Sequence, residues 1–238
     1  MTIEEFSNGF DTLVSSYRRF KDFDKQEMLD SIEFDEYEKS LWLTKAQEEV
    51  VINLYNGKNA YGDSFESTEE IRRYLEGLVK TKVFSTADEV DGTGVSDNSV
   101  FFTLPDDLAF ITMEQVVYGD NALGCYNGKR ADVYPVTQDE YSRIRDNPFR
   151  GPTKYKVVRL DAGGNKVELV SKYGLQSYIV KYLAKPEPII LEDLPNALTI
   201  NGYGSANECK LNTMLHQTIL EKAVQMALMS KGIGMKTN

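Results

Sequence analysis

Both ends of this chain have helical periodicity while its middle has strand-like patterning, and this order restricts the fold more than any other feature. Roughly the last fifty residues contain a strand, SYIVKYLAKPEPIIL, then a Gly-rich turn, then one long helix, CKLNTMLHQTILEKAVQMALMSKG. Because the first third is helical too, the final helix must return across a β-rich middle to find packing partners. The pattern favours a structural role over a catalytic one.

The first 80 residues predict three amphipathic helices. A capping box of Thr2 and Glu5 starts a helix over about 3–20, a second helix follows an acidic segment, and a third begins near Ser67. No amphipathic helix can bury its apolar stripe alone. The final helix, predicted over about 207–231, has a broad apolar face, so we expect a four-helix core built from both ends of the chain.

From about residue 82 no stretch sustains a helical period, and short apolar runs alternate with Gly, Asp and Ser. Such runs predict strands, with a Gly-Gly hairpin turn at 161–165 and one short helix that begins near Thr137. The predicted strands are 100–104, 110–117, 131–136, 155–160, 166–170 and 178–182.

The predicted fold class is therefore α+β: a helical bundle built from the N-terminal helices and the C-terminal helix, with an inserted antiparallel β-sheet region. The predicted domains are a helical bundle formed by 1–81 and 206–238, and a β-rich domain with one short helix at 82–205.

The chain needs no covalent or metal support to fold. With 238 residues, 41% of them hydrophobic, it can bury most of the surface that its unfolded form exposes. Cys125, Cys209 and the single histidine, His216, are too few ligands to complete a zinc site. We interpret the two cysteines as reduced thiols. No apolar window of about 18 residues occurs, and the N-terminus carries acids where a signal peptide has bases. A soluble protein with no membrane segment and no leader is expected.

The acidic balance argues against a specific grip on nucleic acid. The net charge is −10, and residues 1–80 contribute 18 acids against 10 bases. The densest stretch, 21–39, has eight acids and three bases, which opposes binding to phosphates. Passive passage of DNA past an acidic wall is compatible with this composition.

No catalytic, cofactor-binding or metal site is predicted. Any imidazole chemistry would depend on His216, which lies between core positions of the final helix and is interpreted as a packed or capping residue. Neighbouring acids such as Asp22 with Asp24, or Glu48 with Glu49, point apart on a helix or are solvated. Asp88, Asp91, Asp97 and Asn98 do not have the spacing of an EF-hand loop.

The turn Gly202-Tyr203-Gly204-Ser205-Ala206-Asn207 follows a strand and precedes a helix, as a dinucleotide-binding turn does. Its third position is Asn207 in place of glycine, and too little chain follows for a return strand. A plain turn with Asn207 as helix N-cap is the preferred interpretation.

Five segments, taken in order, carry a resemblance to a known family. They are LTKAQEEVVINLYNGKN (43–59), FTLPDDLAFITMEQVVY (102–118), VYPVTQDEYSRIRDNPFRGP (133–152), SYIVKYLAKPEPIIL (177–191) and CKLNTMLHQTILEKAVQMAL (209–228). Together they resemble the head-to-tail connector, or tail adaptor, ring proteins of short-tailed bacteriophages, most closely those of crAss-like phages. The match thins over 60–100.

The resemblance implies a non-enzymatic virion protein made in the bacterial cytoplasm and placed in the neck or tail. Its partners would be copies of itself in a ring of twelve, the portal protein, and neighbouring ring or tail proteins. The genome would pass through the centre without specific binding, since an acidic lumen repels DNA evenly. No cofactor is implied.

A closed ring needs two different complementary faces on each subunit. Candidate faces are the final helix, the PEPIIL edge and the 85–99 loop. The candidate interface residues are Pro186, Pro188, Ile189, Ile190, Leu191, Leu211, Leu215 and Ile219. The candidate channel-facing acids are Asp22, Asp24, Glu27, Asp30 and Glu33.

Two alternatives stay open at the level of sequence. One is a phage-encoded enzyme or nucleotide-binding protein that uses an Asp/Glu site or the 202–207 turn. The other is a different virion role, as a tail or cargo component.

Overall fold

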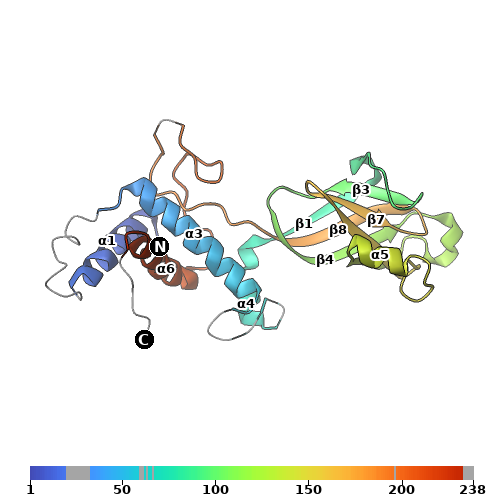
Figure 1. The fold of residues 1–238 in the computed structure, drawn as a ribbon, viewed down its shortest axis with the longest axis horizontal. Coiled ribbons are helices and arrows are strands. Elements are labelled where there is room, and N and C mark those ends of the chain that lie inside the picture. Colours follow the sequence, from blue (N-terminus) through green and yellow to red (C-terminus); the bar gives the residue numbers. More distant parts are fainter. Residues whose placement is uncertain (20–32, 59–61, 63, 66, 196, 233–238) are drawn as a thin grey trace. The chain divides into compact units, whose positions relative to one another are not determined.

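The computed structural model describes residues 1–19, 33–58, 62, 64, 65, 67–195 and 197–232. The chain divides into two compact units (Figure 1). Met1–Leu78 and Pro186–Asn238 form the first, which we call the helical unit, and Val79–Lys185 forms the second, the sheet unit. In the sequence, the sheet unit is thus one uninterrupted stretch inserted between the two segments of the helical unit.

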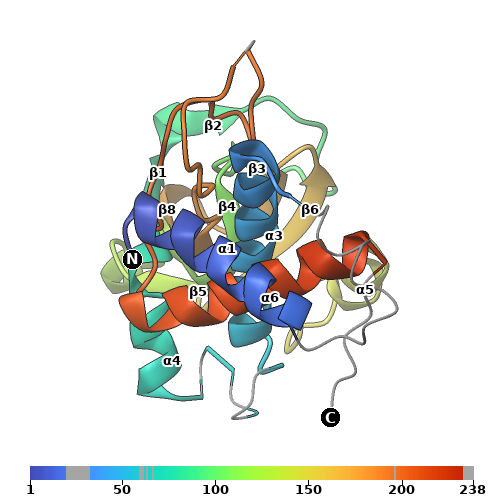
Figure 2. The same cartoon turned by 90° about the vertical axis from the view of Figure 1, so that its left-hand side faces the viewer.

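Three longer helices organise the helical unit: α1 (Ile3–Arg19), α3 (Glu36–Tyr55) and α6 (His216–Ser230). The predicted capping box starts α1, because the Glu5 carboxylate accepts the Thr2 N–H and the Thr2 hydroxyl accepts the Glu5 N–H. The helix α6 packs on both α1 and α3 and crosses them (Figure 2). The described residues also form shorter helical pieces: α4 (Glu69–Tyr74), the 3₁₀ turn η2 (Glu76–Leu78), and the 3₁₀ turn η5 (Thr213–Leu215) before α6.

An extended segment at 187–191 lies along α3 and is bonded to it by side chains. The Leu191 N–H donates to the Ser40 hydroxyl over 3.0 Å, and the Ile189 N–H donates to the Thr44 hydroxyl over 3.1 Å. The Gln47 amide donates to the Glu187 carbonyl over 2.7 Å. A polar stripe on α3 therefore replaces the neighbouring strand that such a segment would otherwise need.

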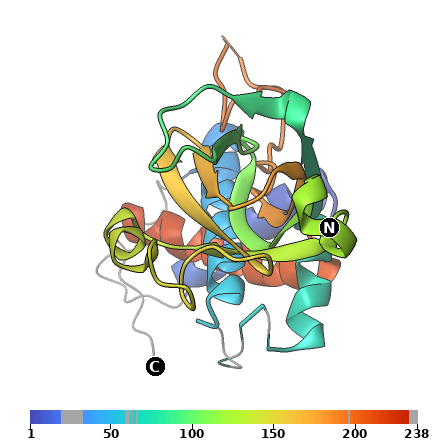
Figure 3. The same cartoon turned by 90° about the vertical axis from the view of Figure 1, so that its right-hand side faces the viewer.

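The sheet unit contains one curled sheet (Figure 3). Its eight strands lie in the order β1-β8-β4-β5-β6-β7-β3-β2. The strands are β1 (Val79–Ser85), β2 (Glu89–Val90), β3 (Ser99–Thr103), β4 (Leu108–Tyr118), β5 (Arg130–Pro135), β6 (Lys156–Gly163), β7 (Lys166–Val170) and β8 (Leu175–Ala184). Two 3₁₀ turns, η3 (Thr86–Asp88) and η4 (Asn121–Tyr126), follow β1 and β4.

One crossover gives the sheet its mixed character. All neighbouring strands pair antiparallel except β5 and β6, which are parallel. A parallel pair needs a long connection, and α5 (Gln138–Ile144), capped by the Thr137 hydroxyl, lies in it. Tyr141 and Ile144 of α5 cover one face of the sheet at Val158 and Leu160.

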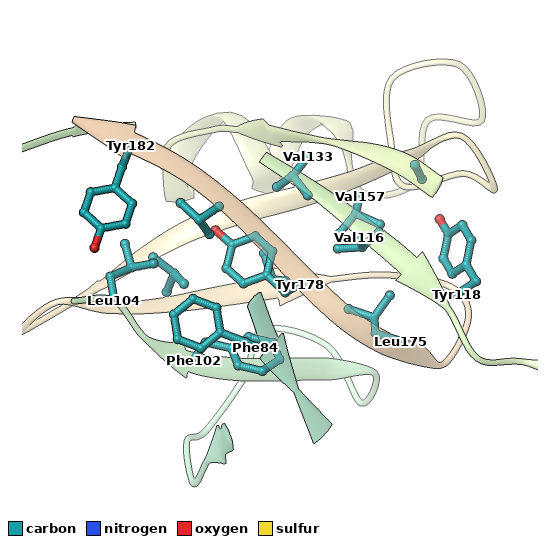
Figure 4. Packing of buried hydrophobic residues seen from close by; sticks show 14 of the residues in the cluster. Phe84, Phe102, Leu104, Val116, Tyr118, Val133, Val157, Leu175, Tyr178 and Tyr182 are labelled. Carbon is teal, nitrogen blue, oxygen red and sulfur yellow. The ribbon is translucent and has the colours of Figure 1, made fainter. Parts of the chain in front are cut away.

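The main core fills the other face of the sheet. Phe84, Phe102 and Tyr178 pack ring to ring with centroids 5.4–5.6 Å apart (Figure 4). Val116 and Val157 lie among the same buried cluster. Consecutive residues are buried over Val157–Leu160 of β6 and Val167–Val170 of β7, so both faces of these strands are covered there, and each run holds one buried charged residue, Arg159 or Glu168.

The predicted fold class was wrong. The eight-stranded sheet dominates the chain, it is mixed and not antiparallel, and the helices do not form a bundle. The predicted third helix is only six residues long, and the apolar positions after it belong to a turn and to β1. The final helix begins at His216 and not near 207.

The two units do not follow the predicted domain limits in detail. The stretch 186–205 packs within the helical unit, whereas the prediction assigned it to the β-rich domain. Independent folding of the two domains stays a prediction.

Candidate assembly surfaces

The predicted interface residues are mostly covered by their own chain. Ile189, Ile190 and Ile219 are fully buried, and Leu191, Leu211 and Leu215 expose less than a tenth of their surface. Pro188 is buried and Pro186 is half-buried. In this conformation they build the interior of the helical unit, and their role in a subunit interface stays a prediction.

The predicted channel-facing acids fall largely outside the described residues. Asp22, Asp24, Glu27 and Asp30 lie there, and Glu33 is exposed immediately before α3. Glu33 opens an acidic run with Asp35, the N-cap of α3, and Glu36 and Glu38 in the first helical turn. Their place in a channel stays a prediction.

The turn at 202–207 does not open a helix. Asn207 forms an isolated bridge with Ile190, and its side-chain amide donates to the Pro188 carbonyl over 2.8 Å. The helix α6 starts nine residues later, so the N-cap role predicted for Asn207 was wrong. Without a helix N-terminus at the turn, the geometry that binds a dinucleotide phosphate is missing from these residues.

His216 is a packed residue at the start of α6. Its Nε2 lies 3.0 Å from the Leu211 carbonyl, its Nδ1 lies 2.7 Å from the Met1 amino nitrogen, and its ring contacts Phe6. A carbonyl only accepts, so Nε2 carries the proton and Nδ1 accepts from the amine. Burial lowers the pKa of His216, which favours the neutral ring.

The described residues contain no cluster of three or more His, Cys, Asp or Glu side chains that could hold a metal ion. Asp88, one of the loop acids weighed as a calcium ligand, instead accepts bonds from the Ser85 N–H and hydroxyl. These bonds lower the pKa of Asp88. Within the same described part of the chain, no helix is long and apolar enough to cross a membrane.

A buried polar cluster lies in the sheet unit, and the sequence had given no sign of it. The Glu114 carboxylate on β4 accepts bonds from Arg159 Nη1 on β6, over 3.2 Å, and from the Tyr178 hydroxyl on β8. Burial raises the pKa of Glu114, and Arg159 only partly opposes this effect. Burial and the nearby carboxylate raise the pKa of Tyr178.

Glu114 and Arg159 of this cluster line a groove of about 760 Å³, together with other residues of β4, β5 and β6. The β4–β5 ladder covers only three residue pairs, Gln115 to Val117, after which β5 pairs with β6. An acid with a raised pKa occurs in many active sites. Here Arg159 and Tyr178 both donate to the Glu114 carboxylate and hold it in a structural cluster. Arg159 Nε is buried without a partner among the described atoms.

A second feature that sequence reasoning missed is a set of exposed and half-buried aromatic and basic residues on the sheet unit. We call it the aromatic–lysine surface; it comprises Tyr126, Tyr134, Phe149, Lys154, Tyr155 and Lys156. The Tyr126 and Tyr155 hydroxyls are 2.7 Å apart, and Lys154 Nζ lies 4.4 Å and 5.0 Å from the two ring centroids.

The rest of this surface continues along the loop before β6. Lys156 Nζ lies 4.7 Å from the Tyr134 ring centroid and donates to the Arg150 carbonyl over 3.1 Å. Phe149 beside it exposes 92% of its surface. A charge count by segment could have found this surface, because 126–159 holds eight bases and four acids in a chain of net charge −10.

Comparison with known proteins gives two kinds of match. A family model described as phage tail ring protein 3/4 matches residues 1–238. Ring protein 3 of Bacteroides phage crAss001 is 48% identical over 233 residues, which is 97% of this chain and 96% of that protein. Ring protein 4/5 of the same phage is 29% identical over 236 residues, covering 95% and 92% of the two chains.

Proposed function

The chain belongs to the phage tail ring protein 3/4 family, and from this premise we propose that it is a subunit of a ring in the head-to-tail connector of a crAss-like phage. The family match spans the whole chain, and the relative with 48% identity is covered over nearly its full length. That coverage is the observation that carries the proposal. A ring subunit of this kind has a structural role in the virion.

In the proposed arrangement twelve copies close into a ring next to the portal or another neck ring, and the genome passes through the centre. Relatives named as ring proteins support a structural, non-enzymatic part. The net charge of −10 on each copy supports passage of DNA without specific binding, since a ring repeats that charge in every subunit. Salt confines the repulsion to roughly 8 Å.

Electron cryo-microscopy of purified virions tests the proposal. We expect ring density in the neck that accommodates one helical unit and one sheet unit per copy, with the symmetry of twelve. Mass spectrometry of the same virions measures the copy number relative to the portal protein. Virions that lack the chain, or that hold it away from the neck, would contradict the proposal.

A further inference from the structure

We propose that the aromatic–lysine surface is the face through which one copy docks on the acidic helical unit of the next copy. The inference rests on the proposed ring and assigns a contact within it. In a ring the two faces of a contact belong to different parts of the subunit, so one face must complement the other.

The charges of the two units are unequal. The helical unit holds 23 acids and 13 bases, a net charge of −10, whereas the sheet unit holds 14 of each. Within the sheet unit, 126–158 carries seven bases and four acids, a net charge of +3, and Arg159, which follows, is buried against Glu114. A basic face on one unit and an acidic excess on the other steer copies into head-to-tail contact and disfavour like-to-like pairing.

The backbone that carries Phe149 is held by hydrogen bonds within its loop. The Asn147 carboxamide oxygen accepts the Phe149 and Arg150 N–H groups, and the Gly151 N–H donates to the Asn147 carbonyl over 2.8 Å. A Cβ at Gly151 would come within 2.9 Å of the Ile144 and Asn147 carbonyls, so the tight turn requires glycine. An almost fully exposed aromatic side chain on a hydrogen-bonded loop is a candidate interface anchor, since aromatic residues are enriched among the residues that dominate binding energy.

The lysines are also held in place before any partner binds. Lys154 lies over the Tyr126 and Tyr155 rings, and its hydrogen bond to Tyr155 raises the pKa of the ammonium group. Lys156 is fixed between the Tyr134 ring and the Arg150 carbonyl. Side chains ordered in advance lose less entropy on binding, which favours a specific contact.

A second copy fits this surface better than a nucleic acid does. A duplex would attract the lysines through its phosphates, but it offers Phe149 only a thymine methyl group, or a gap between base pairs that must first be unstacked. The helical unit supplies both chemistries, since it is acidic and also exposes apolar side chains, among them Ile52, Met214 and Met229.

A zero-length carbodiimide cross-link on purified virions tests the contact with the native protein. The reagent activates a carboxylate, and a lysine amine that touches it displaces the activating group to form an amide. We expect multiples of the 27.0 kDa chain, with Lys154 or Lys156 joined to an acid within 1–78 or 186–238. Multimers joined only through other lysines would overturn the surface proposal while leaving the ring intact. Virions that lack the chain would instead contradict the ring itself.

Charge reversal gives an independent test. We expect Lys154→Glu with Lys156→Glu to lower incorporation into virions by about tenfold or more, the loss of a strong interface contact. Lys172→Glu with Lys181→Glu, at two exposed lysines of the sheet unit, makes the same change in net charge; it is the matched control and should be incorporated normally. Thermal unfolding of the purified variants should match the parent, which separates misfolding from failed docking.

Two further outcomes decide between partners. Reversing the cross-linked acid to lysine should restore incorporation of the double variant. A fluorescent DNA duplex that binds the purified chain at 0.15 M salt, and loses binding in the double variant, would assign the surface to nucleic acid and overturn the proposal.

Discussion

At the scale of single residues, the most consequential feature is the Glu114 carboxylate buried in the sheet. It lies against Arg159 and Tyr178 with little contact with water. Taking both charges out of water costs several kcal/mol per ion, on the order of what their attraction returns. The Glu114–Arg159 pair therefore adds little to the net free energy of unfolding, but removing one of its members is expected to lower that free energy strongly.

We expect Arg159→Met to lower the free energy of unfolding by about 3–5 kcal/mol, because it leaves Glu114 as a buried charge without its cation. The double substitution Arg159→Met with Glu114→Leu should cost clearly less than the sum of the single changes. Urea denaturation of the four proteins measures the coupling. The control is Arg143→Met, which breaks an exposed pair with Asp139 and should cost no more than about 1 kcal/mol. Equal costs at Arg159 and Arg143 would contradict the account.

His216 predicts a pH dependence of stability. Its pKa is lowered in the folded chain, so between that value and the unfolded pKa of about 6.5 the unfolded chain binds more protons. The contribution of His216 is complete above about pH 6.5 and is lost as the pH falls through this window. His216→Gln, which can still donate to the Leu211 carbonyl, should flatten the slope of unfolding free energy between pH 7 and 5. An unchanged slope would refute this assignment.

At the scale of elements, the helix α3 acts as the bonding partner of an extended segment. Ser40, Thr44 and Gln47 are buried polar residues at a spacing that places them on one face of the helix. They satisfy backbone groups of 187–191 that would otherwise be buried unpaired. This explains why PEPIIL lies inside the helical unit and not at a sheet edge.

We expect Thr44→Val to cost about 1–3 kcal/mol of unfolding free energy, because the Ile189 N–H would lose its acceptor inside the protein. The same change at exposed Thr12, whose hydroxyl donates to the Asn8 carbonyl over 2.7 Å, is the control and should cost less than about 0.5 kcal/mol. Chemical denaturation of both variants decides the matter. A neutral Thr44→Val would show that the segment is held by its apolar side chains alone.

The sequence predicted elements well where one physical pattern dominated. The capping box at Thr2 and the strand at Lys166–Val170 were both expected and are both present. The strand β1 was missed because Leu75, Leu78 and Val79 continue the helical spacing begun at Ile71, although the helix ends at Tyr74. Local spacing cannot distinguish a helix from a turn followed by a strand when the deciding contact, with β8, is about 100 residues away.

At the scale of the whole molecule, the order of five moderate matches along the chain identified the family, and that prediction is confirmed. The fold class was not recovered in the same way. The parallel β5–β6 pair and the return of 186–191 to α3 depend on long-range contacts that leave little local signal. The burial of polar residues such as Glu114 and Gln47 leaves no local signal either, since it depends on partners distant in sequence.

The proposed acidic lumen predicts the behaviour of a charge-reversed virion. Changing Asp22, Asp24, Glu27, Asp30 and Glu33 to lysine should slow genome release, because basic side chains along a channel attract DNA phosphates. The rate of DNA release from purified virions measures the effect, and raising the salt concentration should reduce it. DNA release at the parental rate would show that these five acids do not line the channel.

A control with the same change in net charge separates lumen placement from charge alone. Five exposed acids of the sheet unit are suitable: Glu89, Asp91, Asp97, Glu140 and Asp146. Virions with these five changed to lysine should release DNA at the parental rate if the channel is lined by the segment before α3.

The sheet unit leaves and rejoins the rest of the chain through two strands that pair with each other. Val79, its first residue, lies opposite Leu183, close to its last residue, Lys185. Paired strands are about 5 Å apart, so the first and last residues of the sheet unit lie close together. Recombination at these two junctions would exchange residues 79–185 between phages as one piece. Such an exchange would replace the proposed docking surface and leave the sequences of α1, α3 and α6 unchanged.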